Sequence, residues 1–148
     1  MARAVAVGAL LVVVGIQLVP YGPVALPSTR SEPRWDSPRT RELAVRACFD
    51  CHSNEVAWPW YARIAPISWL VRRDVDGGRV ELNFSEWGLR EQEGHEAAES
   101  VADGEMPLAI YTLVQPGAAL SAAERADLVA GLTRTLGGKS GGERDDDD

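Results

Sequence analysis

The chain has 148 residues, of which 45% are hydrophobic and 25% are charged, and its formal net charge is −7. This length corresponds to one domain, and the composition is that of an ordinary globular protein, which excludes a globally disordered or collagen-like chain. The acidic balance provides no basic surface for nucleic acid, and two cysteines are too few for a disulfide-rich scaffold.

The first predicted element is an apolar leader over residues 1–22. Residues 4–19 are apolar or glycine apart from Gln17, and Arg3 with the free amine supplies the basic flank of an export signal. As a helix this stretch would span about 24 Å, short of the ~30 Å hydrocarbon core of a bilayer. We favour an uncleaved N-terminal membrane anchor, with a cleaved secretory signal and a buried core helix as alternatives. Either export alternative places the rest of the chain outside the cytoplasm, at the inner membrane or free in the periplasm.

The remaining residues divide into three predicted parts. Residues 23–36 are rich in proline and are expected to form an extended tether. Residues 37–136 are expected to form the folded domain. Residues 137–148 are rich in glycine and aspartate, which is typical of a solvated, disordered acidic tail.

Two helices are predicted in the first half of the domain. Ser37 followed by Pro38 is a helix start, and this helix is expected to run to about residue 51. A second helix is expected to begin at Pro66 and to end at Gly77-Gly78. Residues 80–87 alternate between apolar and polar side chains, so they are predicted to form a short strand or a packed loop.

Two further helices are predicted in the second half. One covers residues 91–102, and the other begins with a capping box formed by Ser121 and Glu124 and ends at residues 137–138. Together these elements predict an all-α fold with long loops. Loops of this length need a body to pack against, and five tryptophans in a small domain favour the same conclusion.

The strongest motif is the segment Cys48-Phe49-Asp50-Cys51-His52, which is the C-x-x-C-H attachment motif of c-type haem. Two thiols three residues apart can each form a thioether to one of the two vinyl groups of haem. The adjacent imidazole of His52 then reaches the iron from the same side. An export segment fits this interpretation because haem c is attached after translocation.

Other uses of the two cysteines are weighed against this one. A thioredoxin-like redox pair normally follows a strand, whereas the residues before Cys48 are predicted to be helical. A zinc site would combine Cys48 and Cys51 with His52 and His95, but adjacent ligands at 51 and 52 fit one tetrahedron poorly. A structural pair of free thiols is the third alternative.

The iron of a haem normally has a sixth position to fill. Met106 is the candidate, because Pro107 fixes the backbone beside it and a thioether there can be held rigidly. Met1 is excluded because it lies in the leader, and His95 is flanked by acids and expected at the surface. Methionine–histidine ligation raises the reduction potential and suits electron transfer.

The walls of the haem site are predicted from the aromatic run between residues 58 and 87. We expect its aromatic rings to form a slot, and polar groups beside them, Arg63 among the candidates, to bind the two propionates. The Nδ1 hydrogen of His52 also needs an acceptor, expected to be a loop carbonyl fixed near Pro59 or Pro66. The expected wall and propionate side chains include Trp58, Trp60, Tyr61, Trp69, Arg79, Asn83, Phe84 and Trp87.

Further motifs extend this pattern well beyond the cysteines. They are Ser53-Asn54-Glu55, Trp58-Pro59-Trp60-Tyr61, Ile64-Ala65-Pro66, Ser68-Trp69-Leu70, Asp74-Val75, Gly78-Arg79, Leu82-Asn83-Phe84-Ser85 with Trp87, Gly104-Glu105-Met106-Pro107, Tyr111 and Leu120-Ser121. With these motifs the sequence resembles the bacterial haem-binding domain family of small c-type cytochromes over about residues 13–135.

The resemblance implies a cytochrome c-like helical fold around one covalent haem c. It implies thioether attachment at Cys48 and Cys51, His52 as the proximal iron ligand and Met106 as the distal one. The sequence departs from the family at Gln115, where relatives often carry a histidine. Any role of that histidine, such as a backup ligand or a partner contact, is lacking in this chain.

These observations predict a membrane-anchored mono-haem c-type cytochrome that carries out one-electron transfer with redox partner proteins on the extracytoplasmic side. The chain has no nucleophile or acid–base constellation for hydrolysis, so an enzyme is not expected. One alternative is a haem-based sensor or ligand-binding module, which requires an iron position that opens. A peroxidase-type haem enzyme is a further alternative, and His95 is the histidine left to act as its distal base.

Overall fold

The computed structural model describes residues 1–19, 21–92 and 94–137. The described residues fold into helices and loops, with two isolated β-bridges in place of strands, as the all-α prediction requires. The helices are α1 (Ala2–Ile16), α2 (Pro38–Ala47), α3 (Phe49–His52), α4 (Ile67–Glu81), α5 (Glu96–Ala102), α6 (Ala109–Val114) and α7 (Ala122–Leu136), with 3-10 turns η1 (Trp60–Arg63) and η2 (Pro116–Ala118).

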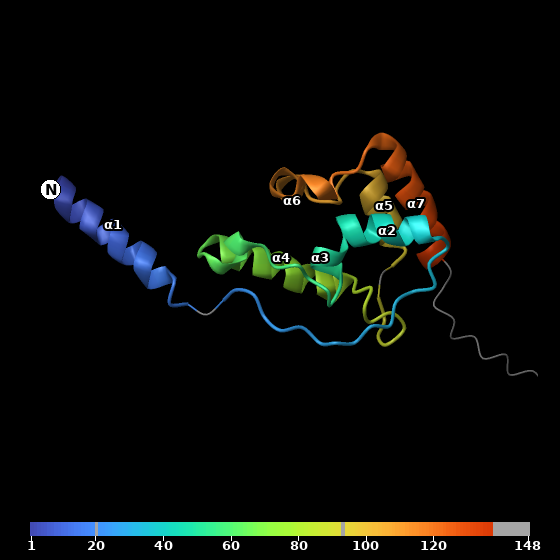
Figure 1. Cartoon of the computed structure of the whole chain (residues 1–148), viewed down its shortest axis with the longest axis horizontal. Helices are drawn as coiled ribbons and strands as arrows, with labels where there is room; N and C mark the ends of the chain where they lie inside the picture. The colour runs from blue at the N-terminus through green and yellow to red at the C-terminus, as the bar shows by residue number, and fades with distance from the viewer. Residues whose placement is uncertain (20, 93, 138–148) are drawn as a thin grey trace, which may run out of the picture.

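The core lies where α2, α5 and α7 pack together with α3 and the segment after α4 (Figure 1). Leu43 of α2 and Leu128 of α7 are fully buried there. Phe84 stacks on Phe49 with 5.5 Å between the ring centroids, and Trp35 packs on Phe84 at 5.2 Å. This aromatic cluster joins the start of the domain to the segment that follows α4.

Side-chain caps set two of the helix starts, as the sequence predicts. The Ser37 hydroxyl accepts a hydrogen bond from the Thr40 N–H at 3.2 Å at the start of α2. At the start of α7, Ser121 and Glu124 form both halves of a capping box. Helix α7 ends at Leu136 with Gly137 as its C-cap, which agrees with the predicted end at residues 137–138. The rest of the expected acidic tail lies outside the described residues.

The first predicted helix is interrupted at Cys48. This residue ends α2 and begins α3 with φ −125° and ψ −35°, outside the helical region. The interruption turns the C-x-x-C-H segment away from the axis of α2. A continuous helix to residue 51 is therefore wrong, because the periodicity of apolar residues does not register a bend at a single residue.

The second predicted helix does not end at Gly77-Gly78, because α4 continues to Glu81. The reason for Gly78 is close packing: a Cβ atom there would lie 2.7 Å from the Cys51 carbonyl oxygen and 3.2 Å from its Cβ. The glycine lets α4 approach α3 at the haem motif. Residues 82–87 form neither a strand nor a helix, and Ser31 bridges to Glu86 there.

The third predicted helix is shorter than expected, since α5 begins at Glu96 rather than near residue 91. Gly94 is buried against the ring of Trp87, whose Cη2 atom a Cβ would meet at 2.5 Å. Helix α6 was not expected from the sequence. In Figure 1 it projects from the bundle toward the same side as α4.

The leader forms α1, which stands apart from the other helices (Figure 1). Among the described residues, no helix is long and apolar enough to cross a membrane, so the expected spanning anchor has no support in the structure. The Gln17 side chain donates to the Ala65 carbonyl at 3.1 Å and accepts from the Ala65 N–H at 3.0 Å. The end of the leader is thereby fixed to the domain.

The proline-rich segment 23–36 runs extended along the domain. The Ser31 N–H donates to the Ser85 carbonyl at 2.8 Å, and the Ser31 carbonyl accepts from the Trp87 N–H at 2.7 Å. Trp35 contributes to the core. The second half of the segment therefore contacts the domain and is more than a spacer.

Candidate functional site

A cavity of about 580 Å³ opens between α3 and α4 on one side and α5 and α6 on the other. This volume lies within the range of small-molecule and cofactor sites. Its lining contains four residues that the sequence predicts as haem ligands or attachment points: Cys48, Cys51, His52 and Met106.

The one-turn helix α3 brings the two thiols and the imidazole to the same wall. The Cys48 carbonyl accepts from the N–H groups of Cys51 at 3.0 Å and His52 at 2.9 Å, which closes the turn. Both cysteines are free thiols. The three-residue spacing of the motif thus places both thiols and the imidazole on the same side of the cavity.

Burial raises the pKa of Cys48 to about 12 and that of Cys51 to about 11, so both thiols are protonated at neutral pH. Redox-active C-x-x-C pairs have lowered pKa values instead, and zinc binds thiolates. In the described part of the chain, no three histidine, cysteine or acidic side chains gather as a metal group. His95 is 72% exposed, does not line the cavity, and lies beside Glu96.

His52 is oriented by a carbonyl that the sequence did not identify. Its Nδ1 lies 3.1 Å from the Leu82 carbonyl oxygen, rather than near a carbonyl fixed by Pro59 or Pro66. Burial lowers the pKa of His52, which favours the neutral imidazole. With Nδ1–H donated to Leu82, the lone pair resides on Nε2, the form in which histidine binds metals.

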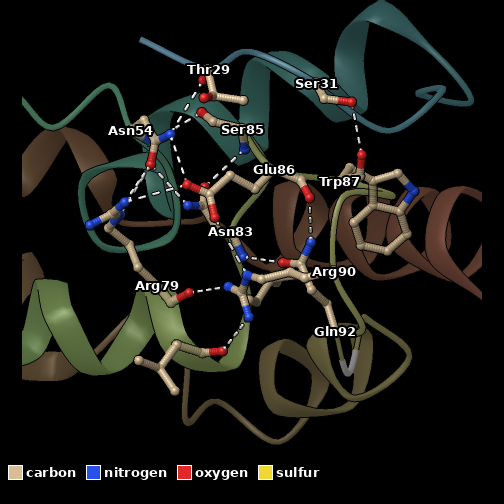
Figure 2. A network of polar contacts seen from close by, with 12 residues as sticks. Thr29, Ser31, Asn54, Arg79, Asn83, Ser85, Glu86, Trp87, Arg90 and Gln92 are labelled. Carbon is tan, nitrogen blue, oxygen red and sulfur yellow. Dashed lines mark hydrogen bonds and ion pairs between the residues drawn. The ribbon is translucent and has the colours of Figure 1, made fainter. Parts of the chain in front are cut away.

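The segment that carries Leu82 is held in place by a polar network centred on Asn54 (Figure 2). The Asn54 Oδ1 atom accepts from Arg79 Nη2 at 2.7 Å and from Asn83 Nδ2 at 2.9 Å. The Asn54 N–H donates to Ser85 Oγ at 3.0 Å. Because the network links the residues after His52 to the end of α4, it fixes the carbonyl that orients the imidazole.

The network continues outward from Asn83 through side chains of the next loop (Figure 2). Gln92 accepts from the Asn83 N–H at 2.5 Å and donates to the Glu86 carbonyl at 3.0 Å. Arg90 donates to the Val80 carbonyl at 2.8 Å. Arg79 and Asn83 are therefore engaged with protein groups, and neither lines the cavity.

The structure places most of the expected haem wall away from the cavity. Seven of the eight side chains predicted to surround the haem do not line it, and the cavity face of α4 consists of small and charged residues such as Gly77, Gly78 and Glu81. Trp60 is 75% exposed and packs edge-on against Tyr61. The residues that lie elsewhere are Trp58, Trp60, Tyr61, Trp69, Arg79, Asn83 and Trp87, whereas Phe84 does line the cavity.

Met106 enters the cavity from the segment between α5 and α6, opposite α3. Its N–H donates to the Ser100 carbonyl at 3.0 Å, and its carbonyl accepts from Arg125 Nη1 at 3.2 Å. Gly104 precedes it with φ +79°, a conformation that favours glycine and reverses the chain after α5. The thioether is thus carried on a backbone that is fastened at both sides.

Sequence reasoning missed a second polar contact at the cavity. The Tyr111 hydroxyl on α6 donates to Asp50 Oδ2 at 2.7 Å, and Asp50 is one of the two variable residues of the C-x-x-C-H motif. Burial and the neighbouring carboxylate raise the pKa of Tyr111, which keeps it a donor. The signal in the sequence was weak, because an acid in a variable position and a tyrosine 61 residues later give no periodic pattern.

Charged residues also line the cavity: Asp50, Arg73, Asp74, Glu81 and Glu96. Four of these five are acidic, so the cavity combines apolar walls with a mostly negative set of side chains.

The chain was compared with known proteins. A family model described as a haem-binding domain matches residues 11–134. No curated protein and no solved structure matches the chain.

Proposed function

Because the chain belongs to the haem-binding domain family, we propose that it is a mono-haem c-type cytochrome that transfers single electrons. One observation carries the proposal: both cysteines, His52 and Met106 line the same cavity. In this assignment Cys48 and Cys51 form the thioethers, His52 is the proximal ligand and Met106 is the distal ligand.

The residues present fit this group. Cys51 and His52 lie on α3 and Cys48 caps its start, whereas the thioether of Met106 comes from the opposite wall, so candidate ligands are available from two sides. The Leu82 carbonyl holds the imidazole in the tautomer that binds metal through Nε2. When bound, haem supplies one-electron chemistry at its iron, and a methionine–histidine pair favours a raised reduction potential.

We also propose that the protein works outside the cytoplasm and exchanges electrons with redox proteins located there. The apolar leader with its basic first residues is the basis for this assignment, since it has the character of an export signal. Covalent attachment of haem at C-x-x-C-H after export fits the same route. No enzymatic activity is proposed, because electron transfer needs only the ligands and the pocket.

The test is a mass measurement on native protein produced in cells with an intact haem-ligation system. We expect the mass of one porphyrin bound covalently, colour that stays with the protein in acid–acetone, and a near-infrared sulfur–iron band in the oxidised form. The measured start of the chain also reports whether the leader is removed.

Matched variants separate attachment from ligation. In Cys48→Ala/Cys51→Ala we expect any pigment to be extractable by acid–acetone, whereas in Met106→Ala we expect covalent pigment without the sulfur–iron band and with rapid carbon monoxide binding to the reduced form. Colourless or fully extractable wild-type protein would refute the c-type assignment. Covalent pigment without the band in the wild type would instead favour a ligand-binding module over an electron carrier.

A further inference from the structure

Two backbone carbonyls flank the chain reversal at Gly104: that of Val101 in the last turn of α5 and that of Met106 beyond the reversal. The Val101 carbonyl accepts from the Gly104 N–H at 3.3 Å, a long bond that leaves its oxygen room for a second donor. Both residues line the cavity, and Val101 is only 2% exposed. A donor that reaches both carbonyls therefore controls the geometry of the loop that carries the thioether.

Arg125 of α7 is that donor. Its Nη1 atom lies 2.5 Å from the Val101 carbonyl oxygen and 3.2 Å from the Met106 carbonyl oxygen. One guanidinium nitrogen carries two N–H groups, so a single atom can serve both acceptors. The bridge spans the turn at Gly104 and ties its two ends together.

Helix α7, which carries Arg125, is itself held firmly in the fold. Arg125 follows the Ser121–Glu124 capping box, and its N–H donates to the Ser121 carbonyl at 2.8 Å. Helix α7 packs along α5 and contributes Leu128 and Leu132 to the core. The guanidinium is thus carried by a helix that is fixed at its start and buried along one face.

We propose that Arg125 is a positioning residue that holds Met106 at the distal side of the haem and thereby strengthens its bond to the iron. This inference rests on the proposed function, because it needs Met106 as a ligand. The Ser100 carbonyl fastens the Met106 N–H through the main chain alone. Arg125 is the side chain through which the position of Met106 can be altered without changing the ligand.

The experiment follows two signals of the oxidised holoprotein during heating: the near-infrared sulfur–iron band and the far-ultraviolet circular dichroism. In Arg125→Leu we expect the band to disappear at a temperature well below the loss of helical signal. Hydrogen bonds from charged donors are strong enough that the population with Met106 detached should rise about 10-fold. Because carbon monoxide binds where Met106 has detached, its binding rate to the reduced variant should also rise about 10-fold.

Arg134→Leu is the matched control on the same helix. Arg134 is exposed and pairs with Asp36 at 2.7 Å, away from the cavity. We expect this variant to lower both thermal transitions together and to leave carbon monoxide binding unchanged. Arg125→Lys keeps the charge but lacks the planar fork, so we expect an intermediate effect. If Arg125→Leu does not fold, the Arg125→Lys variant tests the positioning role by the same two signals.

The outcomes distinguish the two proposals. If wild-type protein shows the band and the Arg125 variants lose it only together with helical structure, as the Arg134 variant does, the positioning role is wrong and the proposed function stands. If wild-type protein carries covalent haem without the band, Met106 is not the ligand and both the ligand assignment and the role of Arg125 fail. If no haem is covalently attached, the c-type assignment itself fails.

Discussion

Single residues determine how closely α3 and α4 pack together along one wall of the cavity. Gly78 is the clearest case, because α4 packs on the backbone of Cys51 where a side chain would not fit. Its position reflects packing and not helix termination, which is why a rule based on glycine as a stop signal failed there. The same contact sets where the Cys51 thiol lies relative to α4.

We predict that Gly78→Ala destabilises the protein by about 1–3 kcal/mol, because the added Cβ forces α4 away from α3. Urea unfolding followed by circular dichroism measures this loss. Gly117→Ala is the control, since a Cβ at that exposed site meets nothing within 4 Å. Equal stability of the two variants would show that the approach of α4 to α3 is not limited by this glycine.

At the scale of elements, capping chemistry and ion pairs stabilise the helix that carries Arg125. Glu124 accepts from Ser121 and pairs with Arg46 of α2 at 2.7 Å and with Arg39 at 3.4 Å. The backbone hydrogen bond from Ser121 and the Arg46 guanidinium lower the pKa of Glu124 to about 2 from its ordinary value of 4.5. Folding therefore favours the ionised carboxylate.

The sign of the pH dependence follows from this shift. The contribution of Glu124 is fully present above pH 4.5 and is lost as the pH falls toward 2. We predict that Glu124→Gln, which keeps a capping side chain but removes the charge, is less stable than wild type at neutral pH and approaches it in that acidic interval. Urea midpoints measured across pH test this, with exposed Glu105→Gln as control. A difference that stays constant with pH would contradict it.

Helix starts marked by a side-chain cap could be predicted from the sequence, whereas the start of α5 and the bend at Cys48 could not. Ser37 and the Ser121–Glu124 box are local signals that act within one turn, so the pattern alone identified them. The interruption at Cys48, the continuation of α4 past Gly78 and the whole of α6 depend on neighbours distant in sequence. Periodicity carries no information on such contacts.

The same division holds for the site. The cysteines and His52 form a contiguous motif, and Met106, which lines the same cavity, was proposed because few side chains can serve as a sixth ligand. The orientation of His52 by Leu82 and the bridge from Arg125 join residues 30 and 19 positions apart, so they required the fold. Apart from Phe84, the predicted wall residues lie away from this cavity, because tryptophan content indicates burial in general and does not say against which group the rings pack.

At the scale of the whole molecule, the cavity separates two groups of helices. The α2–α5–α7 bundle lies on one side and the α3–α4 pair on the other, and their inner faces meet the same volume of about 580 Å³. The cavity is partly open to solvent, and apolar side chains such as Phe84, Val101 and Leu132 line it. The proposed haem would remove this apolar lining from contact with water.

We predict that protein matured with haem unfolds at a higher urea concentration than the same chain produced without haem ligation. A group that binds the folded state alone stabilises it, and covalent attachment keeps that group at the site throughout. Circular dichroism of both forms measures the midpoints, and the slope of each transition reports how much surface is exposed on unfolding. Identical midpoints would mean that the cavity is not the haem site.

The double hydrogen bond between Gln17 and Ala65 joins the end of the leader helix to the domain. Further contacts follow along the chain, because Arg72 donates to the Gly22 carbonyl at 3.2 Å and Ser31 pairs with Ser85 and Trp87. The domain therefore does not hang from its leader on a free tether. For the proposed electron carrier, this would limit exchange to partners that can reach the cavity while the leader lies beside the domain.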